Sequence, residues 1–114
     1  MTGRDFRGYL DDILIYSKKI QGFITGIEYE EFLDDEMRQL SIIRCLEVIG
    51  EASKHIPNEI RNLYPEIPWK VISGTRDYLI HDYTGVNVNL IWKTATNDIP
   101  GLITSISRVI HDYE

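Results

Sequence analysis

Cysteine, long apolar runs and the common catalytic motifs are scarce or missing in this sequence of 114 residues. Cys45 is the only cysteine, which excludes an intrachain disulfide and a cysteine-based zinc site. No apolar run approaches the roughly 20 residues that span a bilayer, and the N-terminal stretch MTGRDFRGYL is not of signal-peptide type. A glycine-rich phosphate loop, a nucleophile elbow and a His-Glu-x-x-His pattern are also missing. We therefore expect a cytoplasmic protein that uses no metal, no cofactor and no membrane.

Basic residues are outnumbered, because 12 lysines and arginines stand against 18 acidic residues, for a net charge of −6. The stretch EYEEFLDDE, Glu28 to Glu36, holds six acids and no base, so it accounts for the whole excess. We interpret it as a solvated acidic corner, and docking of a basic partner is the alternative. The acidity of the chain counts against broad nonspecific nucleic-acid binding, which normally needs a basic surface.

Strand-like alternation is missing as well, whereas apolar residues recur at helical spacing through most of the chain. Pro57 ends one helical pattern, Pro100 predicts a kink inside another, and Gly85 is placed to cap a helix in the left-handed conformation. The spacing predicts an all-α fold: an antiparallel bundle of four main helices with a short extra helix, in a single domain over residues 1–114. The expected helices cover residues 6–22, 29–56 with a possible break in the acidic stretch, 57–64, 68–83 and 88–110, the last capped by Asn87.

Side chains with catalytic potential concentrate in the stretch RDYLIHDY, Arg76 to Tyr83. Arg76 and His81 are five residues apart, so a regular helix separates them by about 140° around its axis and about 7.5 Å along it. Arg76 and Tyr83, seven apart, share a face. His81 belongs to the last helical turn, where exposed carbonyl groups favour a positively charged imidazole. Arg76 supplies a planar fork of donors that matches a phosphate.

This set of side chains suits the cleavage of an RNA phosphodiester without a metal. The 2′-hydroxyl attacks phosphorus, one group removes its proton, another protonates the leaving oxygen, and a cation stabilises the phosphoryl group. Because the two proton transfers occur on opposite sides of phosphorus, we expect a two-fold dimer that brings two copies of His81 and Arg76 to one cleft, formed through the last two main helices. The alternative is structural: Arg76 pairs with Asp77, Asp82 or Glu51, and His81 caps carbonyl groups.

A longer pattern surrounds this stretch. The segments IGEA, YPEIPW, GTRDYLIHDY, GV and IW follow one another between Leu46 and Leu102. In them the sequence resembles the HepT-like branch of the HEPN superfamily, and the helical N-terminal part fits the resemblance. The resemblance implies a HEPN-type four-helix bundle, a homodimer, and a toxin of a two-gene, type II/VII-like toxin–antitoxin system that acts as a metal-independent ribonuclease.

The resemblance also implies roles for single residues. Arg76 and His81 match the family motif of an arginine and a histidine with four to six residues between them, and would be catalytic. Tyr83, two residues beyond the histidine, would accept AMP from a partner, a minimal nucleotidyltransferase antitoxin of the MntA type. Asp77 fills a position that is commonly polar and often asparagine, and it adds negative charge beside the phosphate site. Glu51, in IGEA, would orient Arg76; an ordinary ion pair is the alternative.

Two interpretations without RNA cleavage stay open. The chain could be a non-catalytic HEPN accessory domain that binds a nucleotide or a partner nucleotidyltransferase, with the acidic corner as its main functional surface. A purely structural helical dimer is the other. Lys70, Lys93 and Arg44 are candidates for an RNA-binding rim, whereas Trp69 and Trp92 lie on apolar helical stripes and are expected in the core or an interface.

Overall fold

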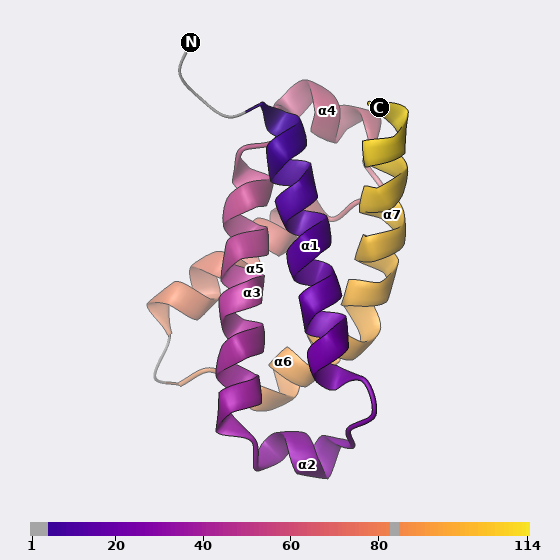
Figure 1. Ribbon diagram of the computed structural model, residues 1–114. Helices are drawn as coiled ribbons and strands as arrows, with labels where there is room; N and C mark the ends of the chain where they lie inside the picture. Colours follow the sequence, from indigo (N-terminus) through magenta and orange to yellow (C-terminus); the bar gives the residue numbers. More distant parts are fainter. Residues whose placement is uncertain (1–4, 83–84) are drawn as a thin grey trace.

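The computed structural model describes residues 5–82 and 85–114, and it is built from helices throughout, which confirms the all-α prediction. Three long helices run side by side: α1 (Phe6–Ile24) lies between α3 (Glu36–Lys54) and α7 (Ile99–Asp112), antiparallel to both (Figure 1). The fourth main helix, α5 (Trp69–His81), crosses the other side of α3 and projects from the bundle. Shorter helices α2 (Tyr29–Leu33), α4 (Asn58–Leu63) and α6 (Val88–Lys93) occupy the connections. The predicted bundle with a short extra helix is therefore confirmed, with further short helices at its ends.

The core is an apolar layer shared by the long helices. Helical spacing aligns the apolar side chains of each helix on one stripe, and those stripes face one another. Fully enclosed side chains come from all four main helices and include Leu10, Ile13, Ile42, Leu79 and Ile106. No helix among the described residues is both long enough and apolar enough to cross a membrane.

The acidic corner interrupts the helical pattern because its carboxylates cap helix ends. Glu28 precedes α2 and forms a capping box with Glu31, while the Asp35 carboxylate accepts a hydrogen bond of 3.0 Å from the Arg38 amide at the start of α3. Phe32, on the single turn between these caps, is fully buried and packs against Trp92. The predicted break is therefore confirmed, and part of the acidity of this corner is explained by capping.

The final helical segment is continuous over residues 88–112 but changes its helix type on the way. A π-helical turn, η1 (Thr94–Asp98), separates α6 from α7 immediately before Pro100. Proline lacks the amide proton that would bond to the carbonyl four residues earlier, and a π turn relieves this defect by widening the helix. The Asn87 side chain caps α6 by accepting a hydrogen bond of 3.2 Å from the Leu90 amide, as expected.

The prediction that Gly85 caps α5 in the left-handed conformation is wrong. The helix ends at His81, and Asp82 is its C-cap, with its amide bonded to the Tyr78 carbonyl. Among the described residues Gly26 is the glycine with a positive φ, at 82°. The Tyr78 hydroxyl accepts a hydrogen bond from the Asn87 amide at 3.1 Å. This side chain of α5 therefore holds the start of α6 in place.

Candidate active site

The candidate site is built where α5 crosses α3, at Gly50. A Cβ atom at this position would lie closer than 3.0 Å to the Arg76 Cβ, and 3.0 Å from the Ile72 carbonyl oxygen. Any residue other than glycine would therefore push the two helices apart. Hydrogen bonds reinforce the crossing, because the Ser53 hydroxyl lies 2.9 Å from the Ser73 hydroxyl and donates to the Gly50 carbonyl at 2.8 Å. Gly50 thus fixes the position of the Arg76 side chain at its base.

The Arg76 guanidinium is held between two carboxylates. Its Nη2 lies 3.4 Å from Glu51 Oε1, and its Nη1 lies 3.1 Å from Asp77 Oδ1. The side chain is 29% exposed, and its Nε is buried without a hydrogen-bond partner. The sequence offered Asp77, Asp82 and Glu51 as partners of this arginine. Two of them, Asp77 and Glu51, form the ion pairs, and Asp82 does not. The guanidinium therefore has a defined position on a side chain that is still partly exposed, so a phosphate can reach it.

Two further residues at the end of α3 complete this network. Lys54 Nζ lies 2.6 Å from Asp77 Oδ1, the same oxygen that Arg76 contacts. His55 Nε2 lies 3.2 Å from Glu51 Oε2, and the His55 ring stacks on Tyr9 at a centroid distance of 4.5 Å. The Lys54 ammonium, followed by the Arg76 guanidinium, lowers the pKa of the Asp77 carboxyl below its ordinary value.

Gly50, Lys54 and His55 had no role predicted from the sequence. The spacing along the sequence could have indicated Lys54 and His55, because they follow Glu51 by three and four residues and so share its helical face. The close approach at Gly50 carried no such signal, since it depends on where α5 crosses.

A hollow of about 280 Å³ opens beside Arg76. It lies among α1, α3 and α5, and Tyr9, Val48 and Ile80 contribute apolar surface to it. Arg44, one of the three basic residues considered for an RNA-binding rim, lines this hollow and pairs with Glu47 at 3.4 Å. Neither Lys70 nor Lys93 belongs to the lining. The hollow is large enough to receive part of a nucleotide whose phosphate lies at the guanidinium.

His81 is the last residue of α5 and is exposed. No hydrogen bond or ion pair joins its side chain to another of the residues 5–82 and 85–114. Helix geometry turns it about 140° away from Arg76, toward the outward face that it shares with Gly74, seven residues earlier. A single chain therefore does not bring the two side chains together. Tyr83, the expected AMP acceptor, lies outside the described residues.

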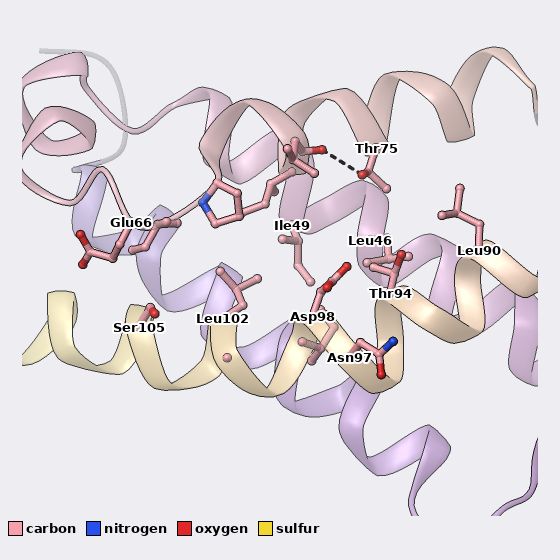
Figure 2. Close-up of a pocket in the computed structure, with 16 residues that line it drawn as sticks. Leu46, Ile49, Glu66, Thr75, Leu90, Thr94, Asn97, Asp98, Leu102 and Ser105 are labelled. Carbon is pink, nitrogen blue, oxygen red and sulfur yellow. Dashed lines mark hydrogen bonds between the residues drawn. The ribbon is translucent and has the colours of Figure 1, made fainter.

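A larger groove of about 580 Å³ lies on the other side of α5 (Figure 2). Leu46 and Ile49 of α3 form its floor, and residues of α6, η1 and α7 form the opposite wall. Val71 and Leu90 border it with 65% and 43% of their surfaces exposed. One chain therefore leaves apolar side chains of α5 and α6 uncovered at the border of this groove.

Among the described residues, no group of three or more histidine, cysteine, aspartate or glutamate side chains could hold a metal ion. The charged side chains at the crossing are instead paired with one another, acid to base.

Comparison with known proteins supports the family resemblance. The model of the family described as ribonuclease HepT-like matches residues 13–109. A protein of Thermococcus cleftensis named as a probable ribonuclease HepT is 48% identical over 99 residues, which cover 87% of this chain and 90% of that protein. A protein of Methanocaldococcus jannaschii whose name describes it, provisionally, as an RNase is 45% identical over 114 residues, covering 100% of this chain and 94% of that protein. No solved structure matches the chain.

Proposed function

The chain belongs to the HepT-like ribonuclease family, and from this premise we propose that it is a toxin that cleaves RNA at a site formed by Arg76 and His81 of two identical chains. The observation that carries the proposal is the Arg76 guanidinium, which the Gly50 crossing and two carboxylates hold beside a hollow that can receive part of a nucleotide. An arginine in a defined position that remains partly exposed is suited to bidentate contact with a phosphate.

In the proposed reaction each residue has one task. Arg76 binds the scissile phosphate and stabilises the negative charge that builds up on its oxygens. One copy of His81 removes the proton from the 2′-hydroxyl, which forms the new bond to phosphorus. The other copy donates a proton to the departing 5′-oxygen as its bond to phosphorus breaks. The products are a 2′,3′-cyclic phosphate and a free 5′-hydroxyl. No metal is required in this scheme.

A second copy of the chain is needed because the two proton transfers occur on opposite sides of phosphorus, and each chain has one His81. We place the contact on the outward face of α5, where Val71, Gly74 and His81 follow one another at spacings of three and seven residues. Val71 is 65% exposed, and a Cβ at Gly74 would have nothing within 4 Å, so another helix can approach closely there. A two-fold axis through this face brings the two His81 side chains toward each other.

Control of the toxin is proposed to act on Tyr83. A partner nucleotidyltransferase would transfer AMP to its hydroxyl, adding bulk and a negative phosphate two residues along the chain from His81. The adduct would occupy the cation that RNA needs. Intact-mass measurement of the chain coexpressed with the partner should show the added mass, and Tyr83→Phe should remove it. An unmodified chain that is nevertheless harmless beside its partner would refute this mode of control.

The toxin proposal is tested by expression of the lone gene. Wild-type protein should arrest growth, and His81→Ala should abolish the arrest while circular dichroism and native mass remain those of the wild type. His111→Ala is the matched control, because His111 is also an exposed histidine in the last turn of a helix. Arrest that survives His81→Ala would refute the assignment. A harmless wild-type protein that binds its partner nucleotidyltransferase would identify an accessory domain instead.

A further inference from the structure

Asp77 presents an electrostatic difficulty for the proposed site. Its carboxylate lies 3.1 Å from the guanidinium that is proposed to bind phosphate, so its negative charge both competes for Arg76 and repels the substrate. Glu51 adds a second carboxylate at 3.4 Å. Arg76 alone cannot balance both acids and remain available to RNA.

Lys54 supplies the missing positive charge. Its ammonium lies closer to Asp77 Oδ1 than Arg76 does, at 2.6 Å against 3.1 Å, and both contact the same oxygen. The group formed by Lys54, Arg76, Glu51 and Asp77 is therefore neutral, and without Lys54 it would carry one net negative charge. The lowered pKa of the Asp77 carboxyl, for which Lys54 is the leading cause, agrees with this order of contacts.

The position of Lys54 in the fold explains why its ammonium group can neutralise the Asp77 carboxylate. It is the last residue of α3, three residues beyond Glu51 on the face that meets α5, and its side chain is 35% exposed. Its partner Asp77 directly follows Arg76 in α5. When a phosphate takes the Nη1 edge of Arg76, Asp77 loses one of its two cations, and Lys54 remains as its partner.

Resting on the proposed function, we propose that Lys54 is a positioning residue for RNA cleavage: it holds and neutralises Asp77, so that the Arg76 guanidinium can exchange Asp77 for the RNA phosphate. Lys54 acts through Asp77 and does not itself touch RNA. A lysine that contacted phosphate directly would contribute whether or not Asp77 carried a charge, which separates the two roles.

The test is a double-mutant cycle on RNA cleavage. Lys54→Met is made in the wild-type chain and in an Asp77→Asn chain, with Lys18→Met as a control that removes one exposed lysine from α1. In the wild-type background, Lys54→Met should lower kcat/KM about two- to fivefold, mainly by raising KM, which is the size expected for a half-exposed ion pair. In the Asp77→Asn background the same change should have an effect below about 1.5-fold. Lys54→Arg should retain activity, since it keeps the ion pair.

Binding of an uncleavable 2′-deoxy oligonucleotide, measured by fluorescence anisotropy, gives a second readout that does not depend on turnover. The loss of affinity should follow the same pattern across the cycle. Equal losses in both backgrounds would overturn the proposal in favour of direct phosphate contact, and no loss in either would overturn it outright. An inactive Asp77→Asn chain would also overturn it, because Asp77 would then have a task beyond pairing with Lys54. Absence of His81-dependent cleavage by wild type is a different result, and it refutes the proposed function itself.

Discussion

Replacement of Gly50 by alanine tests the crossing that positions Arg76. The added methyl group would lie closer than 3.0 Å to the Arg76 Cβ, whereas ordinary contacts of a Cβ atom are 3.4–4 Å, so α5 must retreat by about half an ångström or more. The Ile72 carbonyl, at 3.0 Å, blocks relief on that side because it is backbone. Overpacking of this kind costs about 1–3 kcal/mol. For a domain of this length we expect the melting temperature to fall by roughly 4–12 °C.

The same substitution should also lower the rate of RNA cleavage, because it displaces Arg76. Displacement of a phosphate-binding group by about 1 Å can reduce the rate about a hundredfold. RNA cleavage by Gly50→Ala, measured well below its melting temperature, should therefore fall at least tenfold, while the wild-type oligomeric state is retained.

Gly22→Ala is the matched control, because Gly22 lies in α1 and a Cβ there would meet nothing within 4 Å. Removal of a helical glycine without a clash should stabilise the protein by up to about 1 kcal/mol. The two glycine substitutions are thus expected to have opposite signs. A Gly50→Ala protein that melts at or above the wild-type temperature, with undiminished cleavage, would refute the account of the α3–α5 crossing.

Three further predictions concern other contacts. Tyr64→Phe removes the hydrogen bond of 2.7 Å from the Tyr64 hydroxyl to Asp112 and should destabilise the protein at neutral pH. Because this bond raises the pKa of Tyr64 to about 12, it contributes fully to the free energy of unfolding below pH 10 and loses that contribution as pH rises toward 12. The difference between the two proteins in urea unfolding should therefore vanish over that range. A constant difference up to that pH would contradict it. Val71→Asp should convert the proposed dimer to a monomer in analytical ultracentrifugation, whereas Ile15→Asp, at a residue 49% exposed on α1, should leave it dimeric; equal behaviour of the two would place the interface elsewhere. Arg76→Lys keeps the charge but loses the planar fork, so kcat/KM should fall about tenfold or more without a change in oligomeric state or melting temperature. Full activity would exclude bidentate phosphate contact.

The helices were predictable from the sequence because each carries its own local signals. Apolar residues at helical spacing located α1, α3 and α5, and Pro57 and Asn87 marked boundaries that the structure confirms. The break in the acidic corner was predicted only as possible, since its cause is the competition of carboxylates for helix caps. The π turn before Pro100 was not predicted, because a proline in a helical pattern indicates a defect without specifying how the backbone absorbs it.

The site was predictable only in part because its contacts join different helices. The sequence indicated Arg76 as a phosphate-binding side chain and offered Glu51 and Asp77 as partners, and the structure places both beside its guanidinium. Lys54 is 23 residues from Asp77, and no local pattern connects the two. The role of Gly50 depends equally on the path of α5. Contacts of this kind follow from how helices pack, which spacing along one helix does not determine.

The central claim is that His81 and Arg76 cleave RNA by attack of the neighbouring 2′-hydroxyl, and the most direct test is to map the ends that purified, unmodified protein produces from RNA in excess EDTA. We predict fragments with a 2′,3′-cyclic phosphate and a 5′-hydroxyl from wild-type protein, and intact RNA from His81→Ala under the same conditions. Intact RNA with the wild-type protein, or the same fragments from both proteins, would contradict the claim.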